Sequence, residues 1–231
     1  MKAEYIATLM KTPLFLGISR EEIASFLVCL NPRIQEYKKN EYISMEGNPF
    51  SGIGCVLSGE AAVIKENAAG DRIIMTVVRP GSLFGEMAAW SANPKWPATV
   101  MAQEPTVVLF LPADKIAGSC AKSCRWHTAV IENMLRILAE KALALNKKVE
   151  YLAMKTMRGK LAAYFLERAR MAGNVTFTLP MNRNELADYL GVSRPSMSRE
   201  MGRMRDEGVI DFHMATVKIK EINKLKEAAE E

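Results

Sequence analysis

Serines and arginines crowd into one short stretch near the C-terminal end of the 231-residue chain. Between Arg194 and Arg205 there are four arginines and a single acid, Glu200. A guanidinium can donate two hydrogen bonds to O6 and N7 of guanine, and serine hydroxyls suit phosphate oxygens. The stretch therefore predicts DNA contact, although by itself it also fits a solvated helix face. The residues expected to contact DNA are Ser193, Arg194, Ser196, Ser198 and Arg199.

The other side chains capable of special chemistry do not form a metal-site pattern. The chain has four cysteines: Cys29, Cys55, Cys120 and Cys124. They include no C-x-x-C pair and no accompanying pair of histidines, which a common zinc site needs. Cys120 and Cys124 would share one helix face, but buried or idle thiols are the simpler interpretation. The two histidines, His127 and His213, are far apart in the sequence. His127 could serve as an axial haem ligand, but an ordinary structural histidine is the simpler interpretation. We therefore expect no metal and no cofactor.

The composition is that of a folded, soluble protein. Hydrophobic residues make up 49% of the chain and charged residues 25%, and no apolar run approaches the roughly 20 residues of a membrane span. The N-terminal residues, Met1 to Tyr5, lack the order of a signal peptide. We expect a cytoplasmic protein with reduced thiols and no membrane contact. The net charge of +5 is compatible with nucleic-acid binding.

A first short helix is expected just before the serines and arginines. Asn182, followed three residues later by Glu185, forms a capping box that begins a helix over 183–190. Its apolar residues would face inward, and Gly191 would supply the tight turn that follows. The helix therefore directs the chain into the stretch expected to contact DNA.

A second helix, over 194–207, carries the expected DNA contacts. Ser193 caps it, and Pro195 is tolerated in its first turn, where backbone N–H groups have no intrahelical partner. Three methionines at spacings of four and three would pack one face and turn the arginines outward: Met197, Met201 and Met204. With a strand over 176–179 and a ribbon over 209–219, the pattern predicts a winged helix-turn-helix that reads the major groove. A helix-turn-helix used only for protein contact is the alternative.

A long helix is expected before this domain. No glycine or proline lies between Ala121 and Met157. Apolar residues within it alternate spacings of four and three, which is typical of a coiled coil. These residues are Ile131, Leu135, Leu138, Ala142, Leu145, Val149 and Leu152. We expect this seam to pair with a second copy of the chain, and packing on the chain's own sheets is the alternative.

The N-terminal half alternates short β-rich runs with glycine-containing turns. The runs lie at 53–57, 61–65, 72–78, 99–101 and 106–110. Turns at roughly ten-residue spacing are typical of an antiparallel barrel or sandwich. A helix over 20–30 is expected before them. The period becomes helical after Pro112, which separates this part from the long helix.

The whole chain resembles the superfamily of the cyclic-AMP receptor protein and FNR regulators (Crp/Fnr). The stretches that carry the resemblance are Gly81 to Ala88, the long helix, and Asn184 to Arg199. The resemblance implies a homodimer that binds an inverted-repeat operator in double-stranded DNA, contacts RNA polymerase and senses a signal in a jelly-roll domain. It matches Arg194 and Arg199 to base-reading arginines. Pro195 stands where many members have a base-reading Glu, so the usual target sequence does not carry over.

The resemblance also bears on the sensor. In cyclic-nucleotide members, a Gly-Glu pair opens a short helix and its Glu holds the ribose hydroxyl. An Arg followed by Ser or Thr, ten and eleven residues later, binds the phosphate. Gly85 and Glu86 match the first pair, whereas Trp96 and Pro97 replace the second with neither charge nor hydroxyl. We therefore expect no specific binding of cyclic AMP.

An effector other than cyclic AMP remains the expectation. Two tryptophans and a lysine would suit an aromatic or anionic small molecule. The candidate pocket residues are Gly85, Glu86, Trp90, Lys95, Trp96 and Asn146. Alternatively, the tryptophans pack inside the barrel and Glu86 is structural. Only Cys29 lies where FNR-type members bunch their cluster-binding cysteines, so an iron–sulfur cluster is not expected.

These observations together predict an α+β chain in three segments. Residues 1–118 form the β-barrel sensor, 119–156 the dimerisation helix, and 157–231 the winged helix-turn-helix. The predicted function is a homodimeric, sequence-specific transcription regulator gated by a small molecule, with haem or redox gas sensing as the alternative input. No nucleophile–base pair, phosphate loop or metal-ligand set indicates an enzyme.

Overall fold

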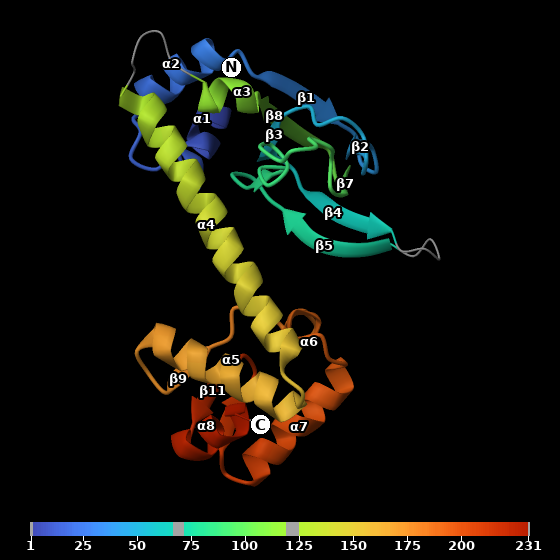
Figure 1. Cartoon of the computed structure of the whole chain (residues 1–231), viewed down its shortest axis with the longest axis vertical. Helices are drawn as coiled ribbons and strands as arrows, with labels where there is room; N and C mark the ends of the chain where they lie inside the picture. Colours follow the sequence, from blue (N-terminus) through green and yellow to red (C-terminus); the bar gives the residue numbers. More distant parts are fainter. Residues whose placement is uncertain (1, 67–71, 119–124, 231) are drawn as a thin grey trace. The chain divides into compact units, whose positions relative to one another are not determined.

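The computed structural model describes residues 2–66, 72–118 and 125–230 (Figure 1). Contacts within the chain divide it into two compact units, Met1–Glu140 and Lys141–Glu231. The long helix α4, Arg125–Ala153, contributes to both units. Three segments are expected from the sequence, with boundaries after 118 and 156, whereas the contacts divide the chain once, within α4.

Two four-stranded antiparallel sheets form most of the first unit. The first sheet has the order β1-β8-β3-β6 and the second has the order β2-β7-β4-β5. The strands of the first sheet are β1 Arg33–Tyr37, β3 Ile53–Ser58, β6 Leu83–Phe84 and β8 Thr106–Leu111. Those of the second are β2 Tyr42–Ser44, β4 Ala61–Glu66, β5 Arg72–Val78 and β7 Thr99–Ala102.

A shared core joins the two sheets. Val56 and Phe110 from the first sheet pack in one cluster with Ala61 and Val100 from the second. Apolar side chains pack here because alternate residues of each strand point toward the facing sheet. The N-terminal domain is therefore a jelly-roll of two sheets, which agrees with the fold class expected from the sequence.

Helices cover a second core of the same unit. The helices are α1 Ala3–Leu9, the 3₁₀ helix η1 Pro13–Phe15, α2 Arg20–Leu30 and α3 Ala113–Ala117, together with the first half of α4. Ser19 and Glu22 form the capping box that begins α2. Phe26 of α2 packs with Ile53 of β3 and Met134 of α4. The start of α4 is thus packed against the jelly-roll domain.

The second unit is a winged helix-turn-helix with its own core. Its helices are α5 Met157–Ala172, α6 Arg183–Leu190, α7 Arg194–Asp206 and α8 Ile222–Glu230. Its strands β9 Thr176–Thr178, β10 Ile210–His213 and β11 Thr216–Ile219 form a sheet in the order β10-β11-β9. Phe165, Leu186 and Met201 bring α5, α6 and α7 into one core. The expected winged unit is confirmed.

The 29-residue helix α4 is amphipathic along its length. It buries Val130, Met134 and Ile137 in the first unit and Tyr151 in the second. Charged residues interrupt its apolar positions, and no helix among the residues described is long and apolar enough to cross a membrane.

Candidate DNA-binding surface and sensor site

Hydroxyl groups and an arginine form a connected row at the start of α7. Ser193 is the N-cap, and its side chain accepts a hydrogen bond from the backbone N–H of Ser196 at 3.4 Å. The Ser193 hydroxyl also donates to Oγ of Ser196 at 2.8 Å, and Nη2 of Arg199 donates to the same oxygen at 3.1 Å. Donors for phosphate and base edges therefore gather at the end of the helix where the macrodipole favours anions.

The two faces of α7 divide as the methionine spacing predicts. Met197, Met201 and Met204 are buried in the core of the second unit. Arg194, Ser198 and Arg199 are exposed, and Ser196 is half-buried. The structure thus brings all five expected DNA-contacting residues together at the N-cap and the first two turns of one helix.

An arginine of α5 binds α7 at two points. Arg158 Nε donates to Oε1 of Glu200 at 2.7 Å, and its Nη1 and Nη2 donate to the two carboxylate oxygens of Glu207 at 2.8 and 2.7 Å. Hydrogen bonds from Arg158 lower the pKa of Glu207 below its usual range. These contacts hold α7, the helix that presents Arg199, against α5. Sequence reasoning missed Arg158, because it lies 42 residues from Glu200.

A second arginine connects the wing to the two helices. The guanidinium of Arg183 lies 5.1 Å from the ring centroid of Phe212, and its Nη2 donates to the carbonyl of Met214 at 3.3 Å. Met214, at the turn between β10 and β11, is 82% exposed. Burial lowers the pKa of Arg183 from its usual value. Arg183 therefore supports the exposed wing tip from the first turn of α6.

The candidate effector residues of the jelly-roll do not share one pocket. Gly85 has a φ of +81°, and a Cβ added there would lie 2.6 Å from Cζ3 of Trp96. Trp96 is only 3% exposed, and its ring centroid is 4.9 Å from that of Phe50 and 5.9 Å from that of Phe84. Trp96 is thus a packing residue against Gly85, whereas the alternative interpretation of the sequence had both tryptophans packed inside the barrel. Glu86 is buried and Lys95 is exposed.

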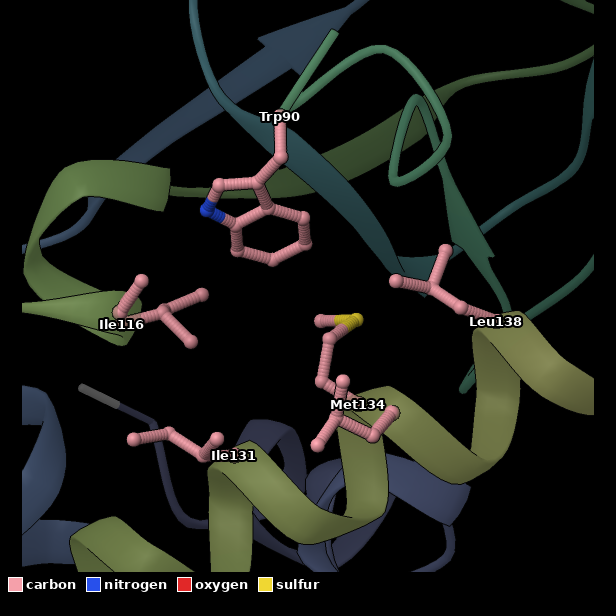
Figure 2. Close-up of a pocket in the computed structure, with 7 residues that line it drawn as sticks. Trp90, Ile116, Ile131, Met134 and Leu138 are labelled. Atoms are coloured by element: carbon pink, nitrogen blue, oxygen red, sulfur yellow. The ribbon is translucent and has the colours of Figure 1, made fainter.

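Trp90 and Asn146 lie elsewhere. The Trp90 side chain is 42% exposed and faces a pocket between α3 and α4 (Figure 2). Asn146 belongs to the second unit, where it lines a different pocket with Tyr164 and Tyr189. The sequence could not separate the two tryptophans, because residue type does not reveal which indole enters the core.

The cysteines and His127 differ in their surroundings. Cys29 is exposed, whereas Cys55 is buried, which raises the pKa of its thiol to about 12. Cys120 and Cys124 lie outside the described residues. His127 is buried, and its Nε2 donates to the carbonyl of Ile116 at 2.7 Å. Within the described ranges, no group of three His, Cys, Asp or Glu side chains is placed to hold a metal ion.

The expected dimer seam is mostly uncovered in the single chain. Leu135, Leu145 and Val149 are 61%, 59% and 56% exposed, and Ala142 and Leu152 are exposed as well. Ile131 and Leu138 are half-buried and line the pocket that Trp90 faces. Leu143, 68% exposed, extends the apolar surface but lies off the four–three spacing, so sequence reasoning missed it.

Comparisons with known proteins agree with this two-part arrangement. The cyclic nucleotide-binding domain profile matches residues 34–123, and the Crp-like helix-turn-helix domain profile matches residues 159–228. The chain is 24% identical to the Cyclic AMP receptor protein of Thermus thermophilus, over 94% of this chain and 97% of that protein. It is 28% identical to the Transcriptional activator protein anr of Pseudomonas aeruginosa, over 75% of this chain and 70% of that one.

A solved structure shows the same fold over nearly the full length. The crystal structure of the Thermus thermophilus Catabolite Activator Protein matches with a TM-score of 0.54 and 25% identity, covering 94% of this chain and 98% of that one. The two relatives are a receptor protein and a transcriptional activator by name, and this chain carries both a cyclic nucleotide-binding domain and a Crp-like helix-turn-helix domain. The chain therefore belongs to the Crp/Fnr family of DNA-binding transcription regulators.

Proposed function

We propose that this protein is a homodimeric, non-enzymatic regulator in the cytoplasm that binds an inverted-repeat operator and is gated by a small molecule other than cyclic AMP. The observation that carries the proposal is the row of Ser193, Ser196 and Arg199 at the start of an α7 whose opposite face is buried. Such a helix can enter the major groove with its N-terminal residues on base edges. RNA polymerase is the further partner that the family membership suggests.

The homodimer is supported by the apolar side chains that α4 leaves exposed. Leu135, Leu145 and Val149 repeat at the spacing of a coiled coil and are all more than half exposed in the single chain. Monomers rarely expose such rows of leucine, because covering them with a second helix removes apolar surface from water. A two-fold dimer would present its recognition helices to half-sites about one helical turn (~34–36 Å) apart.

The exclusion of cyclic AMP is supported by the position of Trp96. Its indole packs against Gly85, next to the Glu86 that matches the ribose-binding residue of cyclic-nucleotide members. A phosphate near an indole instead of an arginine loses charge-assisted hydrogen bonds worth roughly 1.5–3 kcal/mol each. Calorimetric titration should show no specific binding of cyclic AMP at micromolar concentration, and a micromolar dissociation constant would refute this part of the proposal.

Selection of bound fragments from a genomic DNA library tests the main proposal. The purified protein should enrich inverted repeats, with an affinity that falls steeply as salt rises because bound counterions are released from the DNA. Enrichment without a repeat, or no enrichment at all, would contradict it. The absorption spectrum of the same preparation addresses the alternative input, since a Soret band would indicate haem-based sensing.

A further inference from the structure

A pocket of about 280 Å³ lies in the first unit between Trp90, α3 and α4. Figure 2 shows the Trp90 indole facing Met134, with Ile116 and Ile131 on one side and Leu138 on the other. Leu135 and Ala117 complete the lining. Ile116 and Met134 are 1% and 3% exposed, so they form the fixed floor of the pocket. Trp90, at 42% exposed, forms its partly open side.

The lining determines which chemical class fits. Apart from the indole N–H of Trp90, every lining side chain is apolar, so a charged or strongly polar ligand would lose its hydration without gaining a partner. An apolar cavity of about 150 Å³ is known to stay dry and to bind benzene, so this pocket has room for a molecule about the size of two fused rings. The indole adds a flat surface on which such a ring can stack.

We propose that this pocket binds a small, uncharged, apolar molecule and is the effector site of the protein. The inference rests on the proposed effector-gated function and replaces the jelly-roll position, where Trp96 fills the space beside Gly85. Its location suits regulation, because Ile131, Leu135 and Leu138 belong both to the pocket lining and to the expected dimer seam. A ligand against these residues changes the helix surface that a second copy would contact.

The proposal is tested on the full-length protein with 1-fluoronaphthalene as the probe. Its ¹⁹F resonance should broaden and shift on addition of the protein, and unlabelled naphthalene should reverse the change. Anionic 1-naphthoate should bind at least about tenfold more weakly, because the pocket offers its carboxylate no partner. No binding of the uncharged probe, or equal binding of the anion, would overturn the proposal.

Two substitutions test whether the probe binds in this pocket. Ala117→Phe changes a lining residue of α3 that is not part of the seam, and its ring should fill the space and weaken probe binding by at least about tenfold. Asp114→Phe adds the same ring to an exposed position of α3 outside the pocket and should leave binding unchanged. Trp90→Ala removes the open wall and should also weaken binding, which serves as a second variant if Ala117→Phe fails to fold. Unchanged probe affinity in both pocket variants would place the probe elsewhere and refute the proposal.

Three further measurements separate this inference from the proposed function. Operator binding without probe tests the DNA-binding function alone, and sedimentation tests the dimer alone. The probe should change operator affinity at least about threefold in the wild type and not in Ala117→Phe. If the probe fails to bind and Ala117→Phe weakens the dimer, the pocket holds a side chain of the second copy and the effector site is refuted. Probe binding without any change in operator affinity would refute the regulatory role.

Discussion

Arg199 is the residue on which base recognition most depends. Its guanidinium lies at the exposed start of α7 and donates to Ser196, which Ser193 also contacts. This small network holds the arginine near the helix terminus before any DNA is present. An arginine oriented in this way loses less side-chain freedom when it reaches a guanine.

Arg199→Ala should weaken specific binding by about 1–3 kcal/mol per half-site and relax the preference at one symmetric guanine position. Competition between the selected operator and single-base variants measures both effects. Arg203→Ala is the matched control, since Arg203 is exposed, lies one turn further along α7 and pairs with Glu200. If Arg199→Ala lowered affinity equally for every sequence, the arginine would contact phosphate instead.

Gly191 is constrained in two ways. Its φ is +63°, in the region that favours glycine, and a Cβ would lie 2.6 Å from Cδ2 of Leu152. Gly191→Ala should therefore destabilise the second unit by more than about 1 kcal/mol, measured by urea unfolding monitored by circular dichroism. Gly173→Ala has a similar φ of +61° but no atom near its Cβ, so it isolates the backbone cost. Equal losses in the two variants would show that the contact with Leu152 contributes nothing.

In the first unit, the burial of individual side chains was the feature least predictable from the sequence. The sequence indicated that Trp90 and Trp96 belong to one region, and the structure gives them different surroundings. The reason is physical: burial depends on which face of its segment a side chain occupies, and the loop between β6 and β7 has no periodicity from which to derive that face. In α7, by contrast, methionine spacing gave the buried face directly, and all three methionines are buried.

At the scale of elements, the contact between α5 and α7 matters most for DNA binding. Arg158→Met removes the hydrogen bonds to Glu200 and Glu207 while keeping an unbranched side chain. We expect the second unit to lose roughly 1–3 kcal/mol of stability, and operator affinity to fall because α7 is less well positioned. Arg158→Lys should restore only part of both, since lysine cannot bind a carboxylate through two donors in a fixed geometry.

The Arg158 contact should also respond to pH. The pKa of Glu207 is lowered in the folded protein, so its contribution is present above the unfolded pKa and is lost as pH falls through the folded pKa. The stability difference between wild type and Arg158→Met should therefore shrink in acid. A difference that stayed constant with pH would show that packing, and not the charge of Glu207, explains the loss.

The seam of α4 gives a prediction about assembly. Leu145→Ala combined with Val149→Ala should convert the dimer to monomer at micromolar concentration. Replacing a buried leucine by alanine costs about 2–5 kcal/mol, which here would be lost from the stability of the dimer. Both residues are exposed in the single chain, so the monomer should stay folded. Leu143→Ala, equally exposed but off the repeat, should have a smaller effect in sedimentation. An unchanged dimer in the double variant would place the interface elsewhere.

Elements with a strong period were predictable, and those without one were not. The bounds of α2, β5 and α6 match those expected from the sequence, where a capping box begins α6 and turns flank the β-rich run of β5. The strand β1 was missed because four of its five residues are exposed, and β6 because it has only two residues. The helix α8, which buries only Leu225 and Ala228, was not predicted either. Tertiary contacts, not local pattern, stabilise these segments.

At the scale of the whole molecule, the two units have separate hydrophobic cores. Urea should therefore unfold them in two transitions that do not coincide, unlike a single cooperative domain. Far-ultraviolet circular dichroism should follow both units, because both contain helices. Superimposable curves from every probe would show that α4 makes the chain one cooperative unit.

The division into two units also has a spectroscopic consequence. All three tryptophans of the chain, Trp90, Trp96 and Trp126, lie in the first unit, and the tyrosines Tyr151, Tyr164 and Tyr189 cluster in the second. Indole emission is therefore an intrinsic reporter of the first unit alone, and selective excitation of tryptophan does not detect unfolding of the DNA-binding unit. Trp90 is 42% exposed and Trp96 only 3%, so a water-soluble quencher should reach Trp90 much more readily than Trp96. A molecule that binds in the Trp90 pocket should therefore reduce the quenching of Trp90 emission, so its binding can be followed without a label.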